Sequence, residues 1–162
     1  MRGHTVDCKT CLAVELLRAE CNKVLSDNTL VTQDITGDGK PETFCNWAAQ
    51  RISMAMGCWD FRHQIDTAAR MVEIMKEKWR LLDSPKAAHY RALHGGELVI
   101  AGAGNHVAVI YPAPMQLSPS LGVWVPMVAN VGKTNGLMRV SSAFPVAKGL
   151  PDFFVWQGNT RS

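Results

Sequence analysis

The sequence contains no long apolar run, no block of one charge and no recognisable secretory leader. None of its apolar stretches approaches the roughly 18 residues that a membrane-spanning helix needs, so we expect no membrane span. The 17 Lys and Arg residues are scattered among 14 Asp and Glu residues, and the formal net charge is only +3. Nucleic-acid-binding proteins gather basic residues into a patch, so we expect no nucleic-acid partner. The N-terminus lacks the apolar segment of a signal peptide, which leaves three cases open: a cytoplasmic protein, one released by lysis or a dedicated machine, and one whose leader has been removed.

The cysteines are odd in number, so they cannot all pair within one chain. The five are Cys8, Cys11, Cys21, Cys45 and Cys58. Cys8 and Cys11 form a C-x-x-C pattern, but no second pair follows at zinc-ribbon spacing, and no predicted strand precedes the pattern as in redox motifs. For the first predicted helix, a disulfide and free thiols therefore both remain open.

Length and composition predict a single globular domain over residues 1–162. Of the residues, 47% are hydrophobic and 19% are charged, and the chain has no internal repeat, linker or low-complexity segment. Apolar residues recur at helical spacing in three stretches, residues 11–25, 46–56 and 68–82. A fourth helix is predicted between Ser84-Pro85 and Gly95-Gly96, which are typical start and stop signals.

Short apolar runs separated by turn residues follow these helices. They predict strands over residues 98–101, 106–111, 122–131, 137–141 and 153–156. Pro112 and Pro114 are expected to end the second strand, and Pro126 inside the third indicates a sheet edge or a bulge. Because helices come first and an antiparallel meander second, we expect an α+β fold with the N-terminal helices packed on the sheet.

Cys45 lies where a loop rich in Gly and Pro becomes the helix that ends near Gly57. The first N–H groups of a helix lack backbone partners, and the helix dipole is positive at that end. Both features stabilise a thiolate, which is the reactive form of cysteine, so Cys45 is a candidate nucleophile. The alternative is a small, buried and inert residue at the start of the helix.

A thiolate nucleophile needs a general base, and the base needs a third group to orient it. His106 begins an apolar strand directly after a turn with two glycines, which leave one side of it open to a substrate. Asn130 is the one polar side chain inside the next apolar run, and antiparallel pairing can bring it beside His106. Its amide oxygen can accept the imidazole N–H, as in Cys-His-Asn sites. The alternatives are a structurally satisfied histidine and an asparagine that bonds to backbone.

The loop before Cys45 carries oxygen-bearing side chains at alternate positions. Its candidate calcium ligands are Asp34, Thr36, Asp38 and Glu42. Gly39 falls where calcium loops turn sharply, but the loop departs from an EF-hand at its third and twelfth positions. Two interpretations follow: a structural Ca²⁺ site that holds the loop, and a polar turn rich in Asp and Gly.

Three blocks of the sequence resemble a known family. They are Thr-Phe-Cys-Asn-Trp-Ala-Ala with Met-Ala-Met-Gly, then Gly-Glu-Leu-Val-Ile-Ala-Gly followed by Asn-His-Val-Ala-Val-Ile, then Val-Ala-Asn-Val-Gly-Lys-Thr-Asn-Gly-Leu. Over residues 42–143 the chain resembles the compact papain-like cysteine peptidases of the NlpC and CHAP type. It is most similar to the amidase effectors of type VI secretion, which cut peptidoglycan stem peptides.

The resemblance implies an amide hydrolase that works through a thioester acyl-enzyme and requires no cofactor for catalysis. It implies Cys45 as the nucleophile and His106 as the base, while the third residue varies in the family and Asn130 is the candidate here. It also implies an oxyanion hole built partly from the Cys45 backbone N–H. The expected oxyanion or substrate positions are Cys45, Asn46, Gly104 and Asn105.

The resemblance further implies peptidoglycan stem peptides as the substrate and an immunity or inhibitor protein as a partner. It implies a bacterial or phage origin, with action on the cell wall after lysis or dedicated secretion. A competing hypothesis keeps the papain-like shape without catalysis, as a cell-wall-binding or phage structural module. Thiol reactivity separates the two, because only a catalytic Cys45 should react faster than the other cysteines.

Overall fold

Helices precede most of the strands in a computed structural model that describes residues 8–34, 36–39, 43–145 and 149–158. The helices are α1 (Cys8–Leu25), the 3₁₀-helix η1 (Asn28–Leu30), α2 (Cys45–Ala55), α3 (Ala68–Lys78), α4 (Pro85–Gly95) and α5 (Val140–Ala143). The strands are β1 (Arg80–Leu82), β2 (Val99–Ala103), β3 (His106–Ser118), β4 (Val123–Asn130), β5 (Gly136–Arg139) and β6 (Asp152–Val155). The described residues therefore form an α+β fold, as predicted.

Local capping signals set the bounds of α4. The Ser84 hydroxyl accepts the Ala87 N–H, Pro85 occupies the first turn, and Gly96 ends the helix with φ of +61°. Helix α3 ends at Lys78, earlier than predicted, because the following residues form β1 and pair with β6. Long-range strand pairing thus overrides the helical spacing there.

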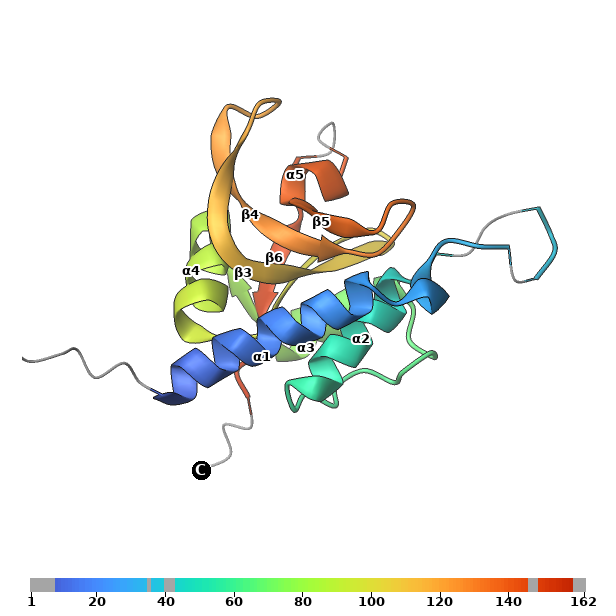
Figure 1. The fold of residues 1–162 in the computed structure, drawn as a ribbon, viewed down its shortest axis with the longest axis horizontal. Coiled ribbons are helices and arrows are strands. Elements are labelled where there is room, and N and C mark those ends of the chain that lie inside the picture. Colours follow the sequence, from blue (N-terminus) through green and yellow to red (C-terminus); the bar gives the residue numbers. More distant parts are fainter. Residues whose placement is uncertain (1–7, 35, 40–42, 146–148, 159–162) are drawn as a thin grey trace, which may run out of the picture.

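All neighbouring strands of the sheet run antiparallel, in the order β1-β6-β2-β3-β4-β5. The predicted meander is confirmed for β2 to β5, whereas β6 returns to lie beside β2. Helices α1, α2 and α3 lie together on one side of the sheet, and α5 lies near β4 and β5 on the other (Figure 1). Among the described helices, none has the length and apolarity that a membrane crossing requires.

Two predictions about the strands are wrong. β3 continues through Pro112 and Pro114 to Ser118, and both prolines lie in the stretch between Tyr111 and Gln116 where the β3–β4 register shifts. Pro126 lies opposite this register shift, on the interior strand β4, so of the two interpretations of Pro126 the sheet edge is wrong and an irregular pairing is present. The predicted strand over residues 137–141 ends at Arg139, and the chain then forms α5.

The first half of β3 forms the centre of the core. Val107, Ala108, Val109 and Ile110 are all buried, so this strand is covered on both faces. Gly102 on β2 permits α3 to approach closely, because a Cβ there would lie 2.9 Å from Val72 Cγ2. This core holds the start of β3, where His106 lies, in a fixed place.

Of the cysteines whose side chains are described, all are free thiols: Cys11, Cys21, Cys45 and Cys58. The Cys8 side chain lies outside the described part of the chain. Cys21, Cys45 and Cys58 are buried, whereas Cys11 is exposed.

Candidate active site

Cys45 is the first residue of α2, at the junction of loop and helix that the sequence predicts. The N-cap residue is Phe44, whose side chain is buried and makes no capping hydrogen bond. Phe44 therefore supplies no cap at the α2 N-terminus, where the helix dipole presents its positive end.

The Cys45 sulfur packs against the backbone at the start of β3. The thiol donates toward the Asn105 carbonyl oxygen, with 3.8 Å between Sγ and O. The backbone N–H of Val107 is close enough to act on the thiol and lower its pKa. Because Asn105 and Val107 flank His106, the fold brings the sulfur to the part of β3 that carries the predicted base.

The expected stabilisation of the Cys45 thiolate is not found in the structure. Burial raises the pKa of the Cys45 thiol above its ordinary value, and it outweighs the lowering by the backbone N–H groups of Val107, Asn46 and Cys45 itself. Cys45 is only 5% exposed, so the loss of hydration destabilises its thiolate more than the helix end and the nearby N–H groups stabilise it. A base is therefore needed to take the thiol proton.

His106 and Asn130 form the predicted contact across β3 and β4. His106 Nε2 lies 2.7 Å from Asn130 Oδ1. The Asn130 amide nitrogen donates to the Thr134 carbonyl oxygen at 2.8 Å, which directs the amide oxygen at the imidazole. A carbonyl oxygen only accepts, so Nε2 carries the hydrogen, and Nδ1 is the basic nitrogen of the neutral ring.

The surroundings of His106 favour its neutral form. Burial lowers the pKa of the imidazole below its ordinary value, and the hydrogen bond with Asn130 acts in the opposite direction. The ring also packs on Phe144, with 4.8 Å between ring centroids. A neutral imidazole with a free Nδ1 is able to accept a proton at neutral pH.

No protein-family model matches this chain, and a search of curated proteins finds no match. The chemistry of the site is therefore assigned from its geometry.

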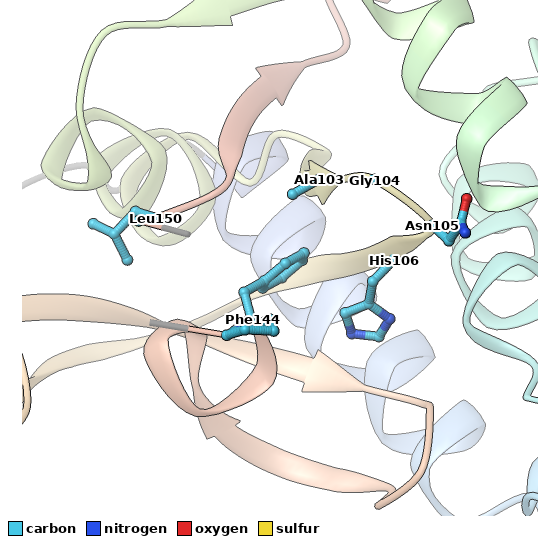
Figure 2. Close-up of a pocket in the computed structure, with 8 residues that line it drawn as sticks. Ala103, Gly104, Asn105, His106, Phe144 and Leu150 are labelled. Atoms are coloured by element: carbon cyan, nitrogen blue, oxygen red, sulfur yellow. The ribbon is translucent and has the colours of Figure 1, made fainter. Parts of the chain in front are cut away.

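Three cavities surround the start of β3 and share lining residues. The first, of about 390 Å³, is bounded by His106, Phe144 and Leu150 (Figure 2). The second, of about 410 Å³, contains His106, Asn130 and the β4–β5 turn in its lining. The third, of about 380 Å³, contains Cys45, Asn46 and Thr67. Cys45 and His106 thus line different cavities, and Asn105 lines both the first and the third.

The positions expected to contact an oxyanion or substrate have different surroundings. The backbone N–H of Asn46 lies beside the Cys45 sulfur. The Asn46 side chain donates instead to the Asp66 carbonyl oxygen, at 3.0 Å. Gly104 and Asn105 form the two-residue β2–β3 turn and line the first cavity. The Asn105 side chain points away from the His106 imidazole (Figure 2). Asn105 also lines the third cavity, together with Cys45.

The candidate calcium loop has the hydrogen bonding of a polar turn. The Asp34 carboxylate accepts three backbone N–H groups, from Gly37, Asp38 and Gly39, at 2.8 to 3.2 Å. Both glycines have positive φ, of +73° and +81°, which explains their place in the turn. Thr36 and Asp38 lie in the described part of the loop, whereas Glu42 lies outside the described residues. Among the described residues, no group of three His, Cys, Asp or Glu side chains is arranged to hold a metal.

The sequence interpretation missed the role of the β4–β5 turn. Gly132, Thr134 and Asn135 lie around the His106–Asn130 pair, and a Cβ on Gly132 would be 3.4 Å from His106 Cε1. A signal was available, because these turn residues directly follow the strand that carries Asn130. Phe144 gave no local signal, since α5 brings it to His106 from a distant part of the chain.

Proposed function

We propose that this chain is a cysteine-dependent amide hydrolase with a papain-like arrangement, and that its substrates are peptidoglycan stem peptides. The observation that carries the proposal is the His106–Asn130 hydrogen bond of 2.7 Å, formed beside the strand backbone on which the Cys45 sulfur packs. The bacterial or phage origin, action on the cell wall after lysis or dedicated secretion, and an immunity or inhibitor protein belong to the same proposal.

The first half-reaction forms a thioester. His106 Nδ1 takes the thiol proton, and the Cys45 sulfur attacks the amide carbonyl carbon. Backbone N–H groups at the start of α2, those of Cys45 and Asn46, stabilise the oxyanion that forms. The imidazolium then gives its proton to the amide nitrogen, the C–N bond breaks, and the amine leaves.

The second half-reaction restores the enzyme. His106 takes a proton from water, and the oxygen attacks the thioester carbonyl carbon. The C–S bond breaks, the sulfur recovers the proton, and the carboxylic acid leaves. Asn130 accepts the Nε2–H throughout, which keeps Nδ1 facing the reaction.

The cavity beside His106 and Asn130 suits a substrate group that carries a carboxylate. Its described lining residues include Lys133, Thr43, Thr134 and Ser142, and they include no Asp or Glu. A short peptide offers its terminal carboxylate to such a site. Lys133 would attract the carboxylate, and the hydroxyls would donate hydrogen bonds to it.

Thiol labelling and digestion of cell walls test the proposal together. Cys45 is expected to react with iodoacetamide faster than Cys58, which is also buried, and His106→Ala is expected to slow that reaction. Purified sacculi of several chemotypes would be digested and their products identified by mass spectrometry, with Cys45→Ala as the inactive control. Absence of any product from all chemotypes would count against wall hydrolysis.

A non-catalytic wall-binding or phage structural module is the second candidate. It is favoured by the small exposure and raised pKa of the Cys45 thiol. In that case Cys45 would label no faster than Cys58, and His106→Ala would leave its rate unchanged. Sacculi would then retain the protein in a sedimentation assay without releasing fragments.

A further inference from the structure

We propose that Thr32 and Asn135 are positioning residues that fasten the β4–β5 turn to the segment before the nucleophile, and so hold His106 and Asn130 in their working orientation. This inference rests on the proposed function. Neither side chain lines the cavity that His106 and Asn130 share. Their effect would pass through the backbone of Gly132.

Two side chains make the connection, and each forms a hydrogen bond that spans at least 100 residues of sequence. Asn135 Oδ1 accepts the Gly132 N–H at 3.0 Å, and Asn135 Nδ2 donates to the Leu30 carbonyl oxygen at 3.0 Å. The Thr32 hydroxyl donates to the Gly132 carbonyl oxygen. Both polar groups of the Gly132 backbone are therefore held by side chains, and one of these comes from the segment after η1.

Gly132 lies next to both His106 and Asn130. A Cβ placed on it would lie 3.4 Å from His106 Cε1 and 3.6 Å from Asn130 Nδ2. The same turn supplies the Thr134 carbonyl oxygen that fixes the Asn130 amide. A shift of this turn would therefore release the amide, and the imidazole would lose the partner that sets its tautomer.

The anchor of the turn is also connected to the helix of the nucleophile. Leu30 is buried and ends η1, whose N-cap Asp27 accepts the Thr29 N–H. The Asp27 carboxylate also pairs with Arg51 of α2, the helix that begins at Cys45. The η1 segment thus links the nucleophile helix on one side with the turn of His106 and Asn130 on the other.

Matched substitutions separate each hydrogen bond from the packing around it. Thr32→Val removes the hydroxyl donor at nearly constant volume, and Thr32→Ser retains it. Asn135→Asp keeps the acceptor for the Gly132 N–H but cannot donate to the Leu30 carbonyl oxygen, while Asn135→Ala loses both. Each variant would be made in the full chain, and melting would establish that it is folded.

The ¹⁵N chemical shifts of His106 report the tautomer and the pKa of the ring. The wild type is expected to show the Nε2–H form, and Thr32→Val and Asn135→Ala a mixture of tautomers with a changed pKa. Alkylation of Cys45 is expected to slow about tenfold in these two variants, because small misplacements of a reacting group carry large kinetic costs. Thr32→Ser is expected to restore wild-type values, and Asn135→Asp to give an intermediate effect.

Val155→Ala, in the buried part of β6, is the control for a general loss of stability. It is expected to lower the melting temperature without moving the His106 shifts. The inference is overturned if Thr32→Val and Asn135→Ala leave the tautomer and alkylation rate as in the wild type, or if Val155→Ala changes them equally. These measurements need no substrate. A failure of this inference can therefore be distinguished from a failure of the proposed function, in which the wild-type protein would release no cell-wall fragment.

Discussion

The Asn130 amide assigns different tasks to the two nitrogens of His106. Its NH₂ group donates to the Thr134 carbonyl oxygen, and its own oxygen lies 2.7 Å from His106 Nε2. Nε2 must therefore be the donor, and Nδ1 keeps the lone pair. Burial holds the ring neutral, while the same hydrogen bond stabilises the cation formed after proton transfer. One side chain thus contacts the imidazole and limits the depression of its pKa.

These opposed effects predict the pH dependence of hydrolysis. The burial-depressed pKa of His106 lies below its ordinary value of about 6.5, so the base is neutral above it and activity should fall as the pH drops through it. Asn130→Ala removes the contact that raises this pKa, so the pH at which activity falls on the acid side should be lower. Asn130→Asp places a carboxylate beside the ring, so that pH should be higher.

Rates of hydrolysis between pH 4 and 8, with the His106 pKa measured by NMR, check this prediction. Both variants should also be slower at their optimum, by about ten- to a hundredfold, because the ring is less well placed. If Asn130→Ala and Asn130→Asp shifted the pH at which activity falls in the same direction, the assignment of Asn130 would be contradicted.

Lys133 tests the carboxylate preference of the second cavity. Lys133→Glu should raise KM for a peptide with a free terminal carboxylate about two- to fivefold, since exposed ion pairs contribute up to about 1 kcal/mol. The same peptide with a terminal carboxamide should be affected little. Lys86→Glu, on α4, makes the same change of net charge away from the cavity and should leave both KM values unchanged. Equal effects on the two peptides would exclude recognition of the carboxylate by Lys133.

Elements follow from the sequence where their signals are local. The capping residues Ser84 and Gly96 bound α4 as predicted, and Cys45 and His106 each begin an element at or within one residue of the expected place. Elements that depend on pairing between distant segments could not be predicted from the sequence. β1 is one of these, because it forms by pairing with β6. The same holds for the candidate site. The contact of His106 with Asn130 is predicted from the order of neighbouring strands, whereas its contact with Phe144 depends on where α5 packs.

The turn made by Asp34 should depend on its hydrogen bonds rather than on a cation. Asp34→Ala removes the acceptor of three backbone N–H groups and should lower the free energy of unfolding by about 1 kcal/mol. We expect this decrease to be the same with calcium and with a chelator, and the wild-type melting temperature to be unaffected by either. A rise in wild-type melting temperature with calcium that Asp38→Ala abolishes would instead establish the calcium site.

At the scale of the whole molecule, the site exists only when helix and sheet are packed together. Cys45 comes from α2, His106 from β3 and Asn130 from β4, so the site has no local folding unit of its own. Its geometry depends on the core beneath β3, where consecutive residues are buried on both faces. Stability and active-site order should therefore be lost together.

Two residues of β3 form a matched pair for this core. Ile110 is fully buried and Leu117 is 47% exposed. Ile110→Ala should lower the free energy of unfolding by about 2–5 kcal/mol, through lost burial and the cavity left behind. Leu117→Ala should change it by less than about 0.5 kcal/mol, because the residue lies on the surface. Urea unfolding followed by tryptophan fluorescence measures both, and similar values for the two would contradict the two-sided burial of β3.

Cys21 and Cys58 offer a separate measure of global opening, because neither takes part in the proposed reaction. Both are buried, and burial raises the pKa of each thiol to about 12. Since only the thiolate reacts, each should be labelled only after the structure opens, and its rate should rise with urea in parallel with the unfolding equilibrium.

Cys11 is exposed and should label at once, whatever the urea concentration. Cys45 should behave differently from both classes, reacting in the folded protein and losing its advantage as urea separates it from His106. Mass spectrometry after timed labelling resolves each thiol in one sample. Cys45 labelling that rises with urea in step with Cys21 and Cys58 would mean that it is a buried core residue, since a thiol that reacts only in the unfolded chain cannot serve as the nucleophile of the folded one.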